Sequence, residues 1–258
     1  MERLLKSYFI LVLALMYLPV LVIVLFSFND SEFMAFPITG LTLDWYAQAI
    51  DDNRLIGGFL NTLSIAAPTA AISTTFGALA ALALTRFRFR GRLVFAALLV
   101  VPFFIPKIIL AVSEVIAMSL TGIPHGVGAI IAAQSLVILP FSVMVIASVL
   151  VRLDRRLEEA AADLGANGWQ VFTRVLLPLM RNGLVASFFI AFVLSTAEYV
   201  VTSFVSGRTQ PLSVMIASDF RFHLSPKVYA LATLIVLGNL LLVAVSEVVR
   251  RRAKGALG

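Results

Sequence analysis

The stretch Val151–Arg181 reads VRLDRRLEEAAADLGANGWQVFTRVLLPLMR, and it is the longest polar interval in a chain otherwise made of apolar runs. The alanines and acidic residues in its first half favour a helix. Gly165 and Gly168 then interrupt that helix, as glycine does near a helix end. A second short amphipathic piece follows, and Leu177 and Pro178 close it. The pattern predicts a helix, a sharp turn and a second helix.

The composition of the chain is that of a membrane protein. Of its 258 residues, 60% are hydrophobic and 13% are charged, and the mean hydropathy is +1.01. Soluble domains average about 45–50% apolar and about 25% charged residues. The absence of cysteine excludes disulfides and cysteine metal sites. His125 and His223 are too isolated to predict a histidine metal site.

Six apolar runs are long enough to cross a bilayer, which takes about 20 residues of helix. Prolines inside four of them predict kinked helices whose freed carbonyls are satisfied by neighbouring helices. The first run can also be read as a signal peptide, but no small-x-small cleavage pattern follows it, so we interpret it as an uncleaved span. Gly77 and Ala81 are small enough for close helix packing in the second run. The predicted spans, within a single transmembrane domain of residues 1–258, are about 8–28, 59–84, 93–120, 127–150, 184–205 and 228–249.

Lys and Arg are distributed unevenly between the two sides of these spans. If the N-terminus is cytoplasmic, 15 of the 20 basic residues fall on the inner side. The positive-inside rule therefore predicts cytoplasmic termini and a cytoplasmic loop at 152–181. The basic and aromatic run Arg86–Arg92 lies in a short inner loop. We interpret it as a contact with anionic lipid headgroups and not with nucleic acid.

The spacing within the 152–181 loop resembles the EAA loop of ABC-importer permeases. Glu159–Ala161 supplies the EAA, Gly165 follows after three residues, and Val175–Pro178 comes nine residues later. The family pattern ends in Ile-x-Leu-Pro, so Val175 is its one departure here. The alternative is an amphipathic helix lying on the membrane surface. Such a helix needs neither the glycine break nor the Leu-Pro stop.

The resemblance implies an all-α transmembrane fold, namely the six-helix type I (MetI-like) importer permease of the bacterial inner membrane. It implies alternating access together with a second, paralogous permease subunit, two ATPase subunits and an extracytoplasmic binding protein. The loop is then a coupling helix in a groove of the ATPase, with Trp169 and Phe172 as interface anchors and Glu159 as the partner of an ATPase arginine. The implied coupling residues are Glu159, Ala160, Ala161, Gly165, Trp169, Phe172, Leu177 and Pro178.

The chain has no ATP site or catalytic motif of its own. A phosphate-binding P-loop needs a Gly-Lys pair, and none of the lysines follows a glycine. A nucleophile elbow and an HExxH motif are also missing. We therefore expect a transport subunit and not an enzyme. The resemblance implies that ATP and Mg are bound by the partner ATPase subunits.

Further stretches along nearly the whole chain resemble spermidine/putrescine permeases of the C type, which implies a polyamine as the solute. Permeases for amino acids or opines, phosphonates and iron(III) look similar and stay open as alternatives. Alternatives of a different class are a secondary transporter, which should carry inverted repeats, and a membrane scaffold. The stretches that carry the resemblance are Leu18-Pro19, Gly40–Thr42, Trp45-Tyr46, Arg86–Gly91, Ser203–Gly207 and Ser225–Thr233.

Glu198 lies in the outer half of the fifth predicted span, where a charge is costly and marks a functional candidate. Ser195, Tyr199 and Thr202 lie near it in the sequence, and the ring of Tyr199 can attract a cation. We expect these four residues to line the substrate path. Alternatively, Glu198 hydrogen-bonds to the partner permease without touching the solute. Polyamine permeases resemble this stretch but carry an acidic pair, whereas Ala197 precedes the single acid here.

Lys107 and Glu114 are the charged residues of the third predicted span. They are seven apart, so they can face the same side of a helix, but about 10 Å along the axis is too far for a direct ion pair. We expect each to pair with another helix or to flank a water-filled cavity. Alternatively, Lys107 extends its ammonium along the helix toward the interface. A lysine beside the path would repel a polycation.

Overall fold

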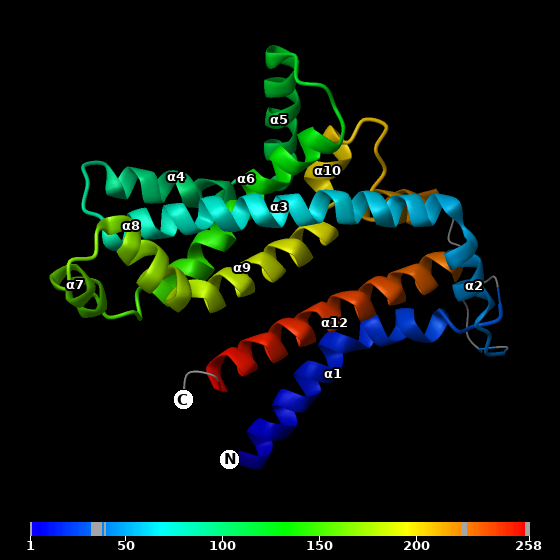
Figure 1. The fold of residues 1–258 in the computed structure, drawn as a ribbon. Helices are drawn as coiled ribbons and strands as arrows, with labels where there is room; N and C mark the ends of the chain where they lie inside the picture. The colour runs from blue at the N-terminus through cyan, green and yellow to red at the C-terminus, as the bar shows by residue number, and fades with distance from the viewer. Residues whose placement is uncertain (1, 32–37, 39, 223–225, 256–258) are drawn as a thin grey trace. The chain divides into compact units, whose positions relative to one another are not determined.

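The computed structural model describes residues 2–31, 38, 40–222 and 226–255. The chain divides into two compact units, one of residues 1–59 and 215–241 and the other of residues 60–214 and 242–258. Helices dominate both (Figure 1). They are α1 (Glu2–Phe26), α2 (Asp44–Asp51), α3 (Asn53–Arg86), α4 (Arg92–Phe104), α5 (Lys107–Thr121), α6 (Val127–Leu150), α7 (Arg156–Asp163), α8 (Gly168–Val171), the π-helical segment η1 (Phe172–Leu176), α9 (Leu177–Ala197), α10 (Val200–Val205), α11 (Leu212–Phe222) and α12 (Pro226–Gly255).

Hydrogen bonds from side chains organise the connections between helices in the first unit. The indole Nε1 of Trp45 donates to the backbone carbonyl of Asn29 at 2.8 Å. The hydroxyls of Ser27 and Tyr46 are 2.6 Å apart. The start of α3 is tied to α11 because the guanidinium of Arg54 donates to both carboxylate oxygens of Asp219, at 3.2 and 2.5 Å. Polar side chains therefore hold the turns of this unit.

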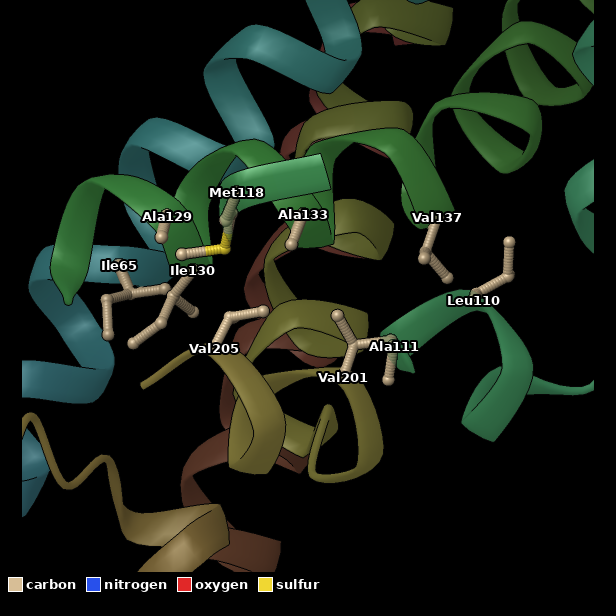
Figure 2. Packing of buried hydrophobic residues seen from close by; sticks show 10 residues of the cluster. All are labelled: Ile65, Leu110, Ala111, Met118, Ala129, Ile130, Ala133, Val137, Val201 and Val205. Atoms are coloured by element: carbon tan, nitrogen blue, oxygen red, sulfur yellow. The ribbon is translucent and has the colours of Figure 1, made fainter. Parts of the chain in front are cut away.

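The core of the second unit is divided between two clusters of buried apolar residues. One lies among α3, α5, α6 and α10 (Figure 2). The other joins α3 and α6 to η1 and α9. The first cluster contains Ile65, Leu110, Ala111, Met118, Ala129, Ile130, Ala133, Val137, Val201 and Val205. The second contains Ala80, Ala81, Leu82, Val143, Ile146, Leu150, Leu176 and Met180.

Four of the described helices are long and apolar enough to cross a membrane, and a fifth span results if α4 and α5 count together. The chain bends by 109° between α4 and α5, far more than a proline kink. Ile105 is extended there, because the ring of Pro106 disfavours helix at the preceding residue. The fifth predicted span begins earlier than expected, since one helical stretch runs from Gly168 to Ala197, and it is then interrupted before α10.

α3 and α6 approach closely at Gly77. A Cβ placed on Gly77 would lie 2.6 Å from the Cβ of Ser142 and 3.1 Å from its backbone carbonyl carbon. Ala81, one turn further along α3, is completely buried. The predicted packing role of these two small residues is thus confirmed.

Gly77→Ala should lower the free energy of unfolding by about 1–3 kcal/mol, because the added methyl group overpacks the contact with α6. Gly128→Ala is the matched control, since a Cβ at that α6 position meets nothing within 4 Å, and alanine favours helix over glycine by about 0.5–1 kcal/mol. Thermal unfolding of the two purified variants in detergent measures the difference. Equal melting temperatures would contradict the close contact.

Candidate functional site

The turn at Gly165 ends α7 in a Schellman motif. The N–H of Gly165 donates to the carbonyl of Ala162 at 2.9 Å, and the N–H of Ala166 donates to that of Ala161 at 3.0 Å. Gly165 has φ = 88°, which is the left-handed conformation that this motif requires and that glycine adopts without strain. The helix and sharp turn expected from the sequence are therefore present.

The second helix of the loop starts with a capping box. Asn167 and Gln170 exchange two hydrogen bonds of 2.9 Å between side chain and backbone, which satisfies two free N–H groups at the start of α8. This helix continues past Leu177-Pro178, so the expectation of a short helix that ends there is wrong. In η1 the N–H of Leu177 bonds to the carbonyl of Phe172, five residues back. We attribute the continuation through Pro178 to this wider turn, since a proline ring clashes with the carbonyl four residues before it in an α-helix.

The loop is fastened to the end of α3. The Arg86 guanidinium forms an ion pair of 2.7 Å with Glu158 and donates to the carbonyl of Leu153 at 3.2 Å. Arg155 donates to the carbonyl of Thr85 at 2.5 Å, which lies among the last carbonyls of α3, where a cation is favourable. The side chain of Arg86 is only 8% exposed, so this arginine contacts the protein and not lipid headgroups. Sequence reasoning missed this attachment.

Several side chains of the loop remain free to contact another molecule. Leu164 is 91% exposed and Trp169 is 72% exposed. The Trp169 ring packs on Phe172, with centroids 5.7 Å apart, and Phe172 packs in turn against the second core cluster. Of the other predicted coupling residues, Ala161 is half-buried, and the exposed ones are Glu159, Ala160, Gly165, Leu177 and Pro178.

Glu198 lies where α9 is interrupted. It has an extended backbone (φ −75°, ψ 110°), and its side chain is only 4% exposed. One carboxylate oxygen accepts a 3.1 Å hydrogen bond from the N–H of Val201, in the first turn of α10. The other accepts from the ammonium of Lys107 at 2.5 Å. Because Lys107 is the first residue of α5, the ion pair joins the break between α4 and α5 to the break between α9 and α10.

A polar network surrounds the backbone of Glu198. Its carbonyl accepts from the hydroxyls of Thr202 at 2.7 Å and of Ser213 at 3.0 Å. The Gln134 amide donates to Thr202 Oγ1 at 2.8 Å and accepts from the hydroxyl of Ser195. The structure thus brings Ser195, Thr202 and Glu198 together, and it adds Gln134 from α6 and Ser213 from α11. Neither addition was predicted, since both are distant in the sequence.

The two charges of the third predicted span have different surroundings. Lys107 pairs with another helix, as expected, and the ion pair with Glu198 lies within this chain. Both carboxylate oxygens of Glu114 are buried and have no hydrogen-bond partner among the described residues. Tyr199 is half-buried at the start of α10. The site is therefore a paired cation and carboxylate at two facing helix breaks.

Apolar helices, broken at an ion pair and connected by a polar loop, define a membrane-embedded transport subunit. The chain belongs to the family of binding-protein-dependent transport system inner membrane components, whose family model matches residues 73–255. It is 33% identical to the spermidine/putrescine transport system permease protein PotC of Escherichia coli strain K12, over 99% of this chain and 98% of that protein. The resemblance to ABC-importer permeases is thus confirmed. Because such relatives are permease subunits and not enzymes, this chain is a transport subunit.

Solved structures show the same fold. A chain of a bacterial alginate ABC transporter, crystallised with an alginate pentasaccharide-bound periplasmic protein, matches with a TM-score of 0.75 at 17% identity, over 97% of this chain and 93% of that one. A chain of the inward-facing MetNI methionine ABC transporter matches with a TM-score of 0.65 at 18% identity, over 83% of this chain and 99% of that one. The predicted all-α, MetI-like class is confirmed.

Glu158→Gln should destabilise the loop by about 1–3 kcal/mol, because the nearly buried Arg86 guanidinium loses its counter-charge. Glu159→Gln is the control, since its side chain is exposed. The measurements are the melting temperature and the rate of tryptic cleavage within residues 152–181. The double variant Arg86→Gln/Glu158→Gln should lose less stability than the sum of the losses in the two single variants. Identical behaviour of the two single glutamine variants would contradict the attachment.

Proposed function

We propose that this permease subunit imports a polyamine such as spermidine or putrescine, delivered by an extracytoplasmic binding protein. The likeness to the E. coli spermidine/putrescine permease from end to end carries the proposal. The Glu198 carboxylate lies in the fifth predicted span, where an acidic group is a candidate contact for a cationic solute. Ser195, Tyr199 and Thr202 are proposed to line the same path.

The proposed assembly has one further permease subunit, a paralogue of this chain, and two ATPase subunits that bind ATP and Mg. The distribution of Lys and Arg supports cytoplasmic termini and a cytoplasmic 152–181 loop. There the loop docks on an ATPase subunit. Trp169 offers an exposed aromatic anchor of the type that dominates interface energetics. Glu159 is exposed in the same loop and is proposed to pair with an ATPase arginine.

The attachment of the loop indicates how ATPase movement reaches the membrane helices. Glu158 and Arg155 fasten α7 to α3, and Gly168 to Ala197 form one helical stretch of 30 residues. A push on the loop therefore acts on α3 and on α9 together. The far end of α9 carries Glu198, so this movement changes the surroundings of the carboxylate and allows alternating access.

Reconstitution tests the substrate. The chain is co-expressed with its partner permease, ATPase and binding protein, and ATP-dependent uptake of radiolabelled spermidine is measured in proteoliposomes, beside labelled amino acid, phosphonate and iron(III). Uptake of spermidine that needs ATP hydrolysis is expected. Thermal stabilisation of the binding protein by one of the other solutes, with no spermidine uptake, would overturn the polyamine assignment while leaving the importer class intact.

Gly165→Val should uncouple transport, because a β-branched residue is strained at φ = 88° and the turn between α7 and α8 must change. Gly168→Val is the matched control. At Gly168, three residues away, an added Cβ also meets nothing within 4 Å, but the backbone has no positive φ. The measurement is uptake together with ATPase stimulation by the loaded binding protein. Full uptake by the Gly165→Val complex would exclude a coupling role for this turn.

A further inference from the structure

The ion pair between Lys107 and Glu198 is unequally exposed. The lysine side chain is 54% exposed, whereas the glutamate side chain is 4% exposed. Lys107 is therefore the accessible member of the pair, and the carboxylate that it contacts is otherwise covered. A primary ammonium against a carboxylate oxygen is also the contact that one amine of a polyamine would make.

We propose that Lys107 is a tethered competitor of the substrate: its ammonium occupies Glu198 when the path is empty, and an amine of the substrate displaces it. This inference rests on the proposed function and extends it, because it makes Lys107 a specificity-determining residue. A tethered group acts at an effective concentration on the order of millimolar. The tethered ammonium thus weakens the binding of every cationic solute at Glu198, and only a solute that binds the carboxylate more tightly than the tether displaces it.

The two oxygens of Glu198 are suited to different tasks. The oxygen that accepts from the N–H of Val201 is held by backbone, so the carboxylate keeps its position when its other partner leaves. The oxygen that contacts Lys107 is bound by a flexible side chain. An exchange of ammonium groups therefore changes one contact and leaves the helix break intact.

The position of Lys107 in α5 favours its release. It is the first residue of that helix, where the helix dipole disfavours a positive charge, so Glu198 is what offsets the charge there. The pair between Arg54 and Asp219 is a useful contrast within the chain. Both carboxylate oxygens of Asp219 are bound by one guanidinium, and this two-point contact is specific and harder to replace.

The test measures spermidine binding to the purified complex of permease and ATPase subunits without the binding protein, as ligand-induced thermal stabilisation. The Lys107→Gln complex should reach half-maximal stabilisation at a spermidine concentration on the order of tenfold lower than the wild type, because the competing ammonium is removed. Glu198→Gln and the double variant should lose the stabilisation. Arg208→Gln removes an exposed cation from the same unit and should match the wild type. Glutarate, a dicarboxylate without an amine, serves as the anionic probe and should stabilise none of them.

Lys107→Arg keeps the charge and covers the case in which Lys107→Gln does not fold. Its guanidinium can bind both carboxylate oxygens, so spermidine should bind more weakly than to the wild type. Unchanged spermidine affinity in either variant would overturn the competitor role and make the ion pair structural. Wild-type uptake tests the polyamine assignment separately. If the wild type imports spermidine but the Lys107 variants bind it with unchanged affinity, only the competitor role is overturned.

Discussion

In lipid, every backbone N–H and C=O must find a partner inside the protein, so an interrupted membrane helix needs other groups that supply those partners. The interruption after α9 meets this constraint with the Glu198 carboxylate and two hydroxyl groups. The Glu198 carboxylate accepts from the N–H of Val201, and its carbonyl accepts from the hydroxyls of Thr202 and Ser213. Both the side chain and the backbone carbonyl of Glu198 therefore hold the break in place. In the exposed loop, free backbone groups at the helix ends are bonded within the protein by the Schellman turn, the capping box and the Arg155 contact with α3.

The local features of the fold were predictable because neighbouring residues encode them. Gly165 and the capping residues lie within a few positions of the bonds they make, and the α6 span matches its apolar run. The contacts that join distant residues were not predictable. Arg86 and Glu158, or Lys107 and Glu198, meet because of helix packing, and neither periodicity nor spacing reports it. The break at Glu198 had a weak signal in the unusually polar run from Ser195 to Thr202, but it has no proline or glycine to mark it. The π-helical turn before Pro178 was equally hidden, since a proline at that place is a common signal of a helix end.

Two pairs of nearby, chemically similar residues divide their tasks in the loop. Glu158 is turned inward and paired with Arg86, while Glu159 is exposed. Phe172 is packed into the core and supports Trp169, which stays exposed. In both pairs, one member fixes the shape of the loop and its neighbour remains available to a partner. A motif that names only Glu159 therefore describes the available group and omits the one that makes its position rigid.

The helical stretch from Gly168 to Ala197 connects this loop to the ion pair. At about 1.5 Å per residue its 30 residues extend about 45 Å. Its first turn carries Trp169, and Glu198 follows its last residue. The ion pair is sensitive to small movements, because the Lys107–Glu198 distance of 2.5 Å needs to grow by only about 1 Å to exceed the length of a hydrogen bond. A shift of α9 against α5 therefore weakens this contact and makes the proposed exchange of ammonium groups easier. On this reasoning, the proposed stroke of the ATPase and the proposed exchange of cations act on the same bond.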